Sequence, residues 1–168
     1  MYQPQDAYKR SRGFTLVESL VALTLLTVAL VPAFIQATSA MQLSTTIRNS
    51  LIAANLAQEG VEVTRAMRDA NWFAGAPFGS GLDACASGCL VQWDSVAPMP
   101  FTPNTPLRFD ALTGLYQYSQ GDNTLFYRTI YVTEISAGEL AIKSEVTWKD
   151  RRNAKSFSVE HHVFDWIQ

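Results

Sequence analysis

The chain has 168 residues, enough for one domain and an appendage. Apolar residues make up 48% of it and charged residues 17%, and much of the apolar excess lies in one block near the N-terminus. A net charge of −2 gives no electrostatic support for nucleic-acid binding, so we expect no nucleic-acid partner.

Residues 1–13 form a polar, basic leader that carries Lys9, Arg10 and Arg12 against Asp6. Residues 14–35 follow and are apolar except for Glu18 and several serines and threonines. A run of about 20 such residues spans a bilayer as a helix. Because basic residues flank it on the N-terminal side, we expect the N-terminus to stay in the cytoplasm and the remainder to be exported. The sequence thus predicts a single-pass protein of the cytoplasmic (inner) membrane.

Glu18 is the exception within this apolar block. A carboxylate in hydrocarbon costs about 2.5–3.5 kcal/mol at mid-helix, and somewhat less near an end, so we treat it as functional. A cleaved secretory signal would need a shorter apolar core followed by its cleavage site. An ordinary membrane anchor would explain the length and the basic flank. It would not explain Glu18 or the junction between Gly13 and Phe14.

Residues 36–71 continue a helical pattern and are predicted to form an amphipathic extension. One apolar row recurs at spacings of three and four, and a second row lies beside it. Within the whole helix, Pro32 is expected to kink or loosen the backbone near Val28, and Gly60 to weaken it by up to ~1 kcal/mol. The first row is Met41, Ser44, Ile47, Leu51, Ala54 and Gln58; the second is Ile52, Leu56, Val63 and Met67.

Residues 72–168 are predicted to form a globular head. Its first part, 72–106, is rich in glycine and proline and reads as an irregular connection, with a short strand near 90–93. Its second part, 107–168, reads as an antiparallel sheet, with short strands at 107–110 and 115–119 and turns at 120–123 and 136–139. Leu140, Ile142, Val146 and Trp148 alternate with Ala141, Lys143, Glu145 and Thr147, as in a half-buried strand. The fold class is therefore α+β, with the amphipathic helix covering an antiparallel meander.

The two cysteines, Cys85 and Cys89, are separated by three residues. Outside the cytosol such a pair can close a small disulfide loop. Free thiols and half of a zinc site are the alternatives. The histidines, His161 and His162, are adjacent, and adjacent strand residues point to opposite faces, which disfavours a shared metal.

Residues 9–18 read Lys-Arg-Ser-Arg-Gly-Phe-Thr-Leu-Val-Glu, and Ser-Leu-Val-Ala-Leu follows. This stretch resembles the class III signal of type IV pilins and pseudopilins. The long helix, the irregular connection and the terminal antiparallel sheet agree with that family's architecture. More weakly, residues 51–72 and the closing strand, which ends at Asp165 and Trp166, are similar to minor pilins of the pilus-modification type.

The resemblance implies a processing pathway. A membrane prepilin peptidase would cut after Gly13 on the cytoplasmic side and methylate the new N-terminus at Phe14. Glu18 lies one helical turn from that terminus, so its carboxylate could pair with the amine of Phe14 in its own or a neighbouring subunit. The implied partners are the prepilin peptidase, other pilin subunits, a pilus assembly platform and, before assembly, the inner membrane.

Three functions follow from these readings. The first is a minor or major subunit of an extracellular type IV pilus, with a minor subunit favoured, in adhesion, motility or DNA uptake. The second is a pseudopilin of a type II secretion or competence system, in a periplasmic filament. The third is a membrane-anchored binding domain that never polymerises. We expect no enzymatic activity and no cofactor or metal, because Glu160, His161, His162 and Asp165 read as surface groups and no catalytic motif occurs.

Aromatic residues of the head could include an adhesive surface, although most of them read as core or ordinary sheet positions. They are Trp93, Phe109, Tyr116, Tyr118, Phe126, Tyr127 and Tyr131.

Overall fold

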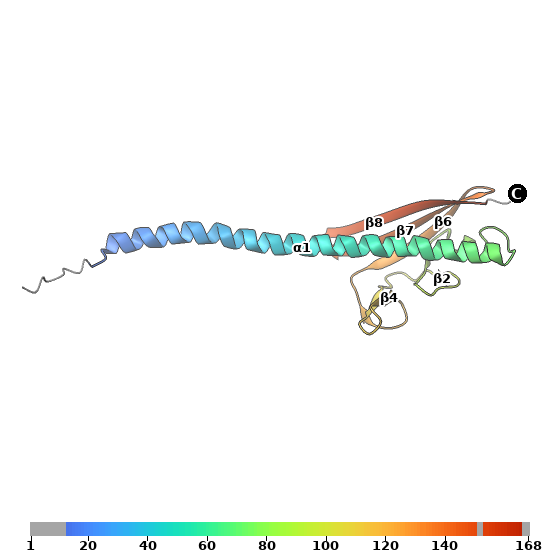
Figure 1. The fold of residues 1–168 in the computed structure, drawn as a ribbon, viewed down its shortest axis with the longest axis horizontal. Helices are drawn as coiled ribbons and strands as arrows, with labels where there is room; N and C mark the ends of the chain where they lie inside the picture. The colour runs from blue at the N-terminus through green and yellow to red at the C-terminus, as the bar shows by residue number, and fades with distance from the viewer. Residues whose placement is uncertain (1–12, 151–152, 166–168) are drawn as a thin grey trace, which may run out of the picture. The chain divides into compact units, whose positions relative to one another are not determined.

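A computed structural model describes residues 13–150 and 153–165 of the chain (Figure 1). Its first element is one long helix, α1 (Leu16–Phe73), which continues through Pro32. The chain divides into two compact units, one ending at Thr45 and the other beginning at Thr46. Helix α1 therefore contributes residues to both units, which are described separately below. The basic leader, residues 1–12, lies outside the described residues.

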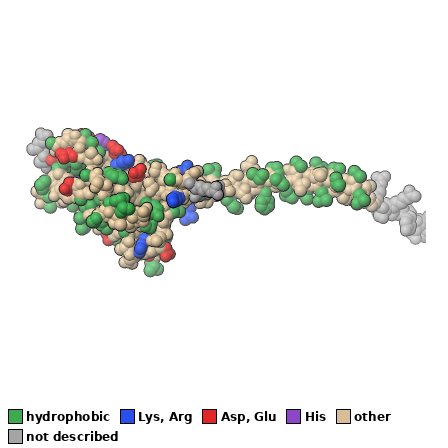
Figure 2. All heavy atoms as spheres, turned by 180° about the vertical axis from the view of Figure 1, so that it is seen from behind, with side chains coloured by type: hydrophobic (Ala, Val, Ile, Leu, Met, Phe, Trp, Pro, Cys, Tyr) green, Lys and Arg blue, Asp and Glu red, His purple; other side chains and the backbone are tan. Residues whose placement is uncertain are grey.

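In the first unit every described side chain, from Gly13 to Thr45, is exposed. Figure 2 shows hydrophobic side chains along this helical segment. Within the described chain, α1 is the one helix that is long and apolar enough to cross a membrane. Its most apolar stretch has a mean hydropathy of 2.2 and contains no buried residue. The first unit thus presents an apolar surface that the chain itself does not cover.

The second unit is built on a five-stranded antiparallel sheet with the strand order β2-β1-β6-β7-β8. Its three long strands follow one another in the chain and form the predicted meander, with an unbroken β7–β8 register from Glu139 opposite Phe164 to Asp150 opposite Asn153. The bounds are β1 (Cys89–Leu90), β2 (Met99–Pro100), β6 (Tyr127–Ser136), β7 (Glu139–Asp150) and β8 (Asn153–Phe164). The α+β class, a long helix packed on an antiparallel sheet, is confirmed.

The face of β7 that was predicted to be buried is buried in the structure: Leu140, Ile142, Val146 and Trp148 all lie in the core. Ala141, predicted on the opposite, exposed face, is also buried, with 7% of its surface exposed. Strand β7 is paired on both sides, by β6 and β8. A methyl group at such a central position is readily covered by longer neighbouring side chains.

Helix α1 covers this sheet through a row of mostly small residues, which the sequence reading did not select. The first predicted row is wrong: Met41, Ile47 and Leu51 are exposed. In the second predicted row Leu56 and Met67 are buried, whereas the remaining two are half-buried. Small side chains allow the helix to approach the sheet closely, which larger apolar residues would prevent. The buried residues of α1 are Ala53, Leu56, Ala57, Gly60, Val61, Thr64 and Met67.

Gly60 marks the closest approach of α1 to the sheet. A Cβ atom placed on Gly60 would lie 2.6 Å from the Ser144 hydroxyl oxygen and 2.7 Å from Ile130 Cδ1. A Cβ atom does not come that close to its neighbours, so the side chains of Ser144 and Ile130 would have to shift to admit any residue larger than glycine. The residue that weakens the isolated helix is therefore the one that permits its packing.

The segment between α1 and β6 contains the short strands predicted near 107–110 and 115–119, but they form a small sheet of their own and are not part of the main sheet. Its short strands β1 and β2 join the main sheet, and a 3-10 turn, η1 (Asp83–Cys85), precedes β1. A second, three-stranded sheet has the order β4-β3-β5. Its strands are β3 (Arg108–Asp110), β4 (Leu115–Gln117) and β5 (Asp122–Asn123). Residues 122–123, predicted as part of a turn, form β5 because their backbone pairs with β3.

Two neighbouring groups of buried side chains make up the core of the head. One joins α1 to the disulfide-containing segment and to strands β6, β7 and β8, and includes Val61, Met67, Leu82, Val91, Ile130, Ile142 and Val163. The other joins α1 to the end of β7 and to the segments that flank the small sheet. It includes Ala53, Leu56, Ala57, Leu107, Phe126, Val146 and Trp148.

Candidate processing and assembly site

The predicted processing junction lies just before α1. Gly13, Phe14 and Thr15 precede the first helical residue, Leu16. A Cβ atom on Gly13 would meet nothing within 4 Å, and 75% of the Phe14 surface is exposed. The peptide bond between Gly13 and Phe14 is therefore outside the helix and is not covered by any described part of the chain.

Thr15 caps the start of α1, a role that the sequence reading missed. The backbone N–H of Glu18 donates to the Thr15 hydroxyl oxygen at 3.2 Å. The N–H of Ser19 donates to the Thr15 carbonyl at 3.1 Å. These are the bonds of an N-cap residue, which satisfies donors that the first helical turn leaves free. The Thr-x-x-Glu spacing is a helix-start signature and could have located this boundary in advance.

Glu18 stands in the first turn of α1 and its side chain is exposed. A negative charge is favourable there because the helix N-terminus carries a partial positive charge. No charged residue occurs between Glu18 and Arg48. Glu18 is therefore an isolated carboxylate at the start of a long uncharged surface, one helical turn after Phe14.

The hydroxyl groups within the apolar segment bond back to the helix itself. Thr24 Oγ1 donates to the Val21 carbonyl at 2.8 Å, and Thr27 Oγ1 donates to the Leu23 carbonyl at 2.7 Å. Such local bonds satisfy the hydroxyl groups without a partner outside the helix. They make these residues compatible with an apolar environment.

Cys85 and Cys89 form a disulfide bond in the structure, with their Cα atoms 4.7 Å apart. Both residues are buried and belong to the core. The bond ties η1 to the start of β1 and thereby fixes the connection between α1 and the sheet. In the described part of the chain no group of three or more His, Cys, Asp or Glu side chains is arranged to hold a metal.

The histidine pair on β8 is separated as its spacing predicts. His162 lies between two carboxylates, with Nδ1 2.6 Å from Glu139 Oε1 and Nε2 3.3 Å from Glu160 Oε1. Hydrogen bonding to Glu139 and then to Glu160 raises the pKa of the His162 imidazole above its usual value. His161 lies on the opposite face of the strand. The exposed cluster around His162 is thus an ion-pair group of the sheet surface.

A buried arginine is the main polar feature of the head that the sequence reading missed. Arg128 on β6 is 1% exposed. Its Nη1 donates to the Leu56 carbonyl at 2.8 Å and to the Glu59 carboxylate at 2.9 Å, and its Nη2 donates to the Val91 carbonyl at 2.6 Å. One guanidinium group therefore joins α1, the segment after β1 and the sheet. No local pattern in the sequence marks it, because its partners lie far away in the chain.

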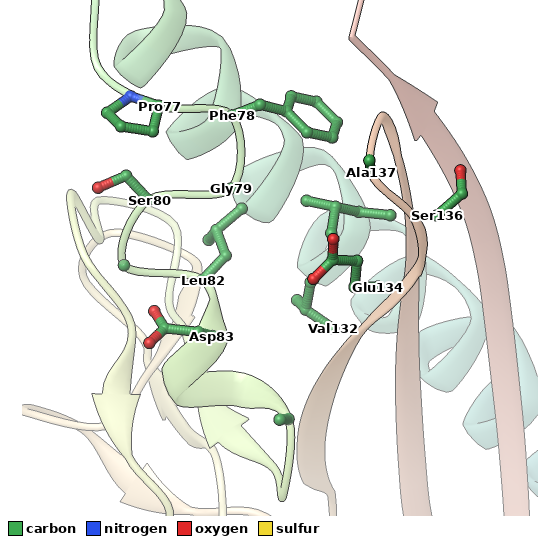
Figure 3. A pocket seen from close by; sticks show the side chains of 13 residues that line it. Pro77, Phe78, Gly79, Ser80, Leu82, Asp83, Val132, Glu134, Ser136 and Ala137 are labelled. Atoms are coloured by element: carbon green, nitrogen blue, oxygen red, sulfur yellow. The ribbon is translucent and has the colours of Figure 1, made fainter.

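A cavity of about 520 Å³ lies between the 77–83 loop and the turn that joins β6 to β7. Its walls include the apolar residues Leu82, Val132 and Leu140, and the carboxylates of Asp83 and Glu134 also line it. Figure 3 shows Glu134 pointing toward the loop and Ser136 pointing away from it.

Comparison with known proteins bears on the N-terminal region. Residues 8–34 match a family model described as the prokaryotic N-terminal methylation motif. Neither curated proteins nor solved structures gave a match. The matched residues contain the junction at Gly13 and Phe14, the cap at Thr15, and Glu18. Together with the long helix packed on an antiparallel sheet, this motif supports membership of the type IV pilin family.

Proposed function

We propose that this chain is the precursor of a structural filament subunit and not an enzyme. Hydrolysis of the bond between Gly13 and Phe14 by a prepilin peptidase releases the leader as a carboxylate and leaves a free amine on Phe14. A methyl group is then transferred to that amine from a sulfonium methyl donor, which leaves as a thioether, and the nitrogen loses a proton. The methylation motif over residues 8–34 is the observation that carries this proposal.

The geometry of the junction supports cleavage at this position. A peptidase must bind its substrate in an extended form, and the helix begins only at Leu16 because Thr15 caps it. Gly13 has open space around its Cα atom, so an enzyme can approach the backbone closely. Cleavage there leaves the apolar helix intact, and the subunit remains anchored in the inner membrane with its N-terminus inside.

Assembly then uses the exposed apolar helix. The first unit buries none of its described side chains, so neighbouring helices or lipid must cover its surface. In a filament, helices from neighbouring subunits cover one another, and the Glu18 carboxylate pairs with the amine of Phe14. An unpaired carboxylate in an apolar core is costly, so the pair favours one register between subunits.

We assign the chain to the minor subunits of an extracellular pilus. The short Cys85–Cys89 loop supports this choice, because it differs from the large C-terminal disulfide loop of many major pilins. A pseudopilin of a secretion or competence system has the same N-terminal chemistry. Counting this subunit in purified surface pili separates the two: incorporation at a low ratio to a major subunit supports the assignment, and restriction to the cell envelope contradicts it.

Mass spectrometry of the mature protein tests the processing step. We expect an N-terminus at Phe14 whose mass is raised by one methyl group. The Gly13→Val variant should stay uncut, since a branched side chain blocks the approach of the enzyme, while its head folds normally because nothing contacts Gly13. An uncut wild-type chain, a terminus near Met41, or normal maturation of Gly13→Val would contradict the proposal.

A further inference from the structure

The cavity between the 77–83 loop and the β6–β7 turn is lined by a charge from the core-facing row of β6. Alternate residues of a strand share a face, and in this row Arg128, Ile130 and Val132 are all buried. Arg128, the first charge of the row, has three hydrogen-bond partners inside the head. Glu134 is the next residue of the row, beyond the last buried one, and it lines the cavity.

A β-bulge at the end of β6 sets the direction of the Glu134 side chain. The register shifts between Glu134, which lies opposite Leu140, and Ser136, which lies opposite Glu139. On a regular strand two residues this far apart would share a face, but the extra residue between them turns the strand. In Figure 3 Glu134 accordingly points toward the loop and Ser136 points away from it. The bulge thus leaves one carboxylate, and not the neighbouring hydroxyl group, at the cavity.

This carboxylate is not neutralised from within the part of the chain that the structure describes. Glu134 has no hydrogen-bond or ion-pair partner there, and neither has Asp83, which lines the cavity from the loop side. The described lining residues carry these two negative charges and no positive one. Arg68 lies 5.8 Å from the ring of Phe78, but its guanidinium group is already held by Asp69 at 3.1 Å. A cation is therefore missing from the cavity's own lining.

The loop wall of the cavity is fixed by contacts within the head. Asn71 Nδ2 donates to the Ser80 carbonyl at 2.6 Å, and the Leu82 N–H donates to the Gly79 carbonyl at 2.9 Å. A Cβ atom on Gly79 would lie 3.0 Å from Leu140 Cδ1, so the loop approaches the sheet closely. Ligand sites are usually preformed in this way, and the volume of about 520 Å³ lies within their common range of roughly 300–1,000 Å³.

We propose that this cavity binds an organic cation, a primary ammonium group on a short alkyl chain. The ammonium group donates to the carboxylate of Glu134, and such charge-assisted hydrogen bonds are stronger than neutral ones. The apolar side chains of Leu82, Val132 and Leu140 cover the alkyl chain. Either a free amine or the lysine side chain of another protein supplies this chemistry, since lysine has the same apolar stem and charged head. A bare Ca²⁺ ion fits less well, because it takes about six to eight oxygen ligands.

Titration with n-butylammonium chloride, which reproduces the lysine side chain, tests the site in the full-length protein in a nonionic detergent. The NMR signals of the Leu82, Val132 and Leu140 methyl groups should shift and saturate. Those of Leu56, which is buried in the other part of the core, should not. We expect n-butanol, which has the same chain without the charge, to bind at least tenfold more weakly. Absence of a saturable shift, or equal binding of n-butanol, overturns the proposal.

Substitutions that remove one carboxylate each test the contact. Glu134→Gln should weaken n-butylammonium binding about tenfold, and Asp83→Asn about two- to threefold, because only Glu134 contacts the ammonium group. Asp122→Asn is the matched control, since Asp122 is an exposed residue of β5 and its loss changes the net charge equally. The methyl spectrum of each variant without ligand shows that the head is folded. Wild-type affinity in Glu134→Gln, or an equal loss in Asp122→Asn, overturns the proposal.

A carbodiimide distinguishes the two sources of the cation, because it activates a carboxylate and joins it to an adjacent amine. Applied to intact cells, it should link Glu134 to a lysine of another protein if that side chain fills the cavity, and Glu134→Gln should remove the link. Binding of n-butylammonium without any such link assigns the site to a free amine. The site does not depend on processing, so an uncut junction at Phe14 would contradict the proposed function and leave this inference intact.

Discussion

Residues 16–45 and residues 46–73 belong to one helix, yet they differ in what covers them. In the first stretch every side chain is exposed and Glu18 is the one charged residue. In the second, a row of small residues is buried against the sheet, and charged residues occupy the exposed faces. Helical periodicity alone therefore does not show which face of the helix is buried in the core. Side-chain size decides how closely the helix approaches the sheet, and the remaining apolar surface is left for other molecules.

The largest effect is expected on filament assembly, from removal of the Glu18 charge in the exposed stretch of α1. Glu18→Ala should be cut at the same junction, because the Thr15 cap and the exposed Gly13 remain. Its incorporation into filaments should fall at least tenfold, since the pairing that sets the register is lost. Quantifying the subunit in sheared filaments against its amount in the membrane measures this.

Glu18→Gln separates charge from shape in the same experiment. Glutamine keeps the size of the side chain and its suitability for the third position of a capped helix. We expect this variant to assemble as poorly as Glu18→Ala. Full assembly of Glu18→Gln would show that the side chain acts through packing and not through its charge.

The next largest effect is expected on the stability of the folded head, from a change at the contact between the buried stretch of α1 and the sheet. Arg128→Ala removes the guanidinium group that holds α1 at Leu56 and Glu59, and it leaves the Val91 carbonyl without its donor. The carboxylate of Glu59 that remains is 34% exposed, so the main cost is the loss of a charged donor by the Leu56 and Val91 carbonyls, at about 1–3 kcal/mol each. Urea unfolding of the full-length protein in detergent should show a loss in the free energy of unfolding of that size.

Arg65→Ala is the control for this loss. Arg65 lies on the exposed side of α1, 3.7 Å from Glu62 and 4.0 Å from Asp69. An exposed pair contributes about 0–1 kcal/mol, so the variant should unfold close to the wild type. Equal destabilisation by Arg65→Ala and Arg128→Ala would mean that the buried contacts of Arg128 do not hold the helix to the sheet.

These two arginines also show what a sequence can and cannot reveal. The N-terminal motif, the start of the helix and the β6–β7–β8 meander follow from local signals: a spacing, a cap or an alternation. The burial of Arg128 does not, because it depends on Glu59 and Val91, which come near only in the folded head. The covering face of α1 was misjudged for a similar reason. Gly60 and Ala57 are buried because the sheet packs against them. The periodicity of the helix sequence carries no information about that sheet.

A smaller loss is expected from removal of the disulfide. The Cys85→Ala and Cys89→Ala double variant opens a loop of five residues, for which the chain-entropy model gives about 2 kcal/mol. Alanine avoids placing a polar group at two buried positions. The urea midpoint of the double variant should fall, and the wild type treated with a reductant after unfolding should refold to the same lower stability. Unchanged stability would show that packing alone fixes the segment between η1 and β1.

The smallest effect concerns the exposed ion pairs of His162. Hydrogen bonds to Glu139 and Glu160 raise the pKa of this imidazole above the usual value for histidine, so the folded protein holds the proton more tightly than the unfolded chain. The resulting stabilisation is fully present below the unfolded pKa and is lost as the pH rises through the higher folded pKa. His162→Gln should therefore lower the urea midpoint at pH 5.5 more than at pH 8.5. A His162→Gln loss that is equal at both pH values would mean that the imidazole acts without its charge.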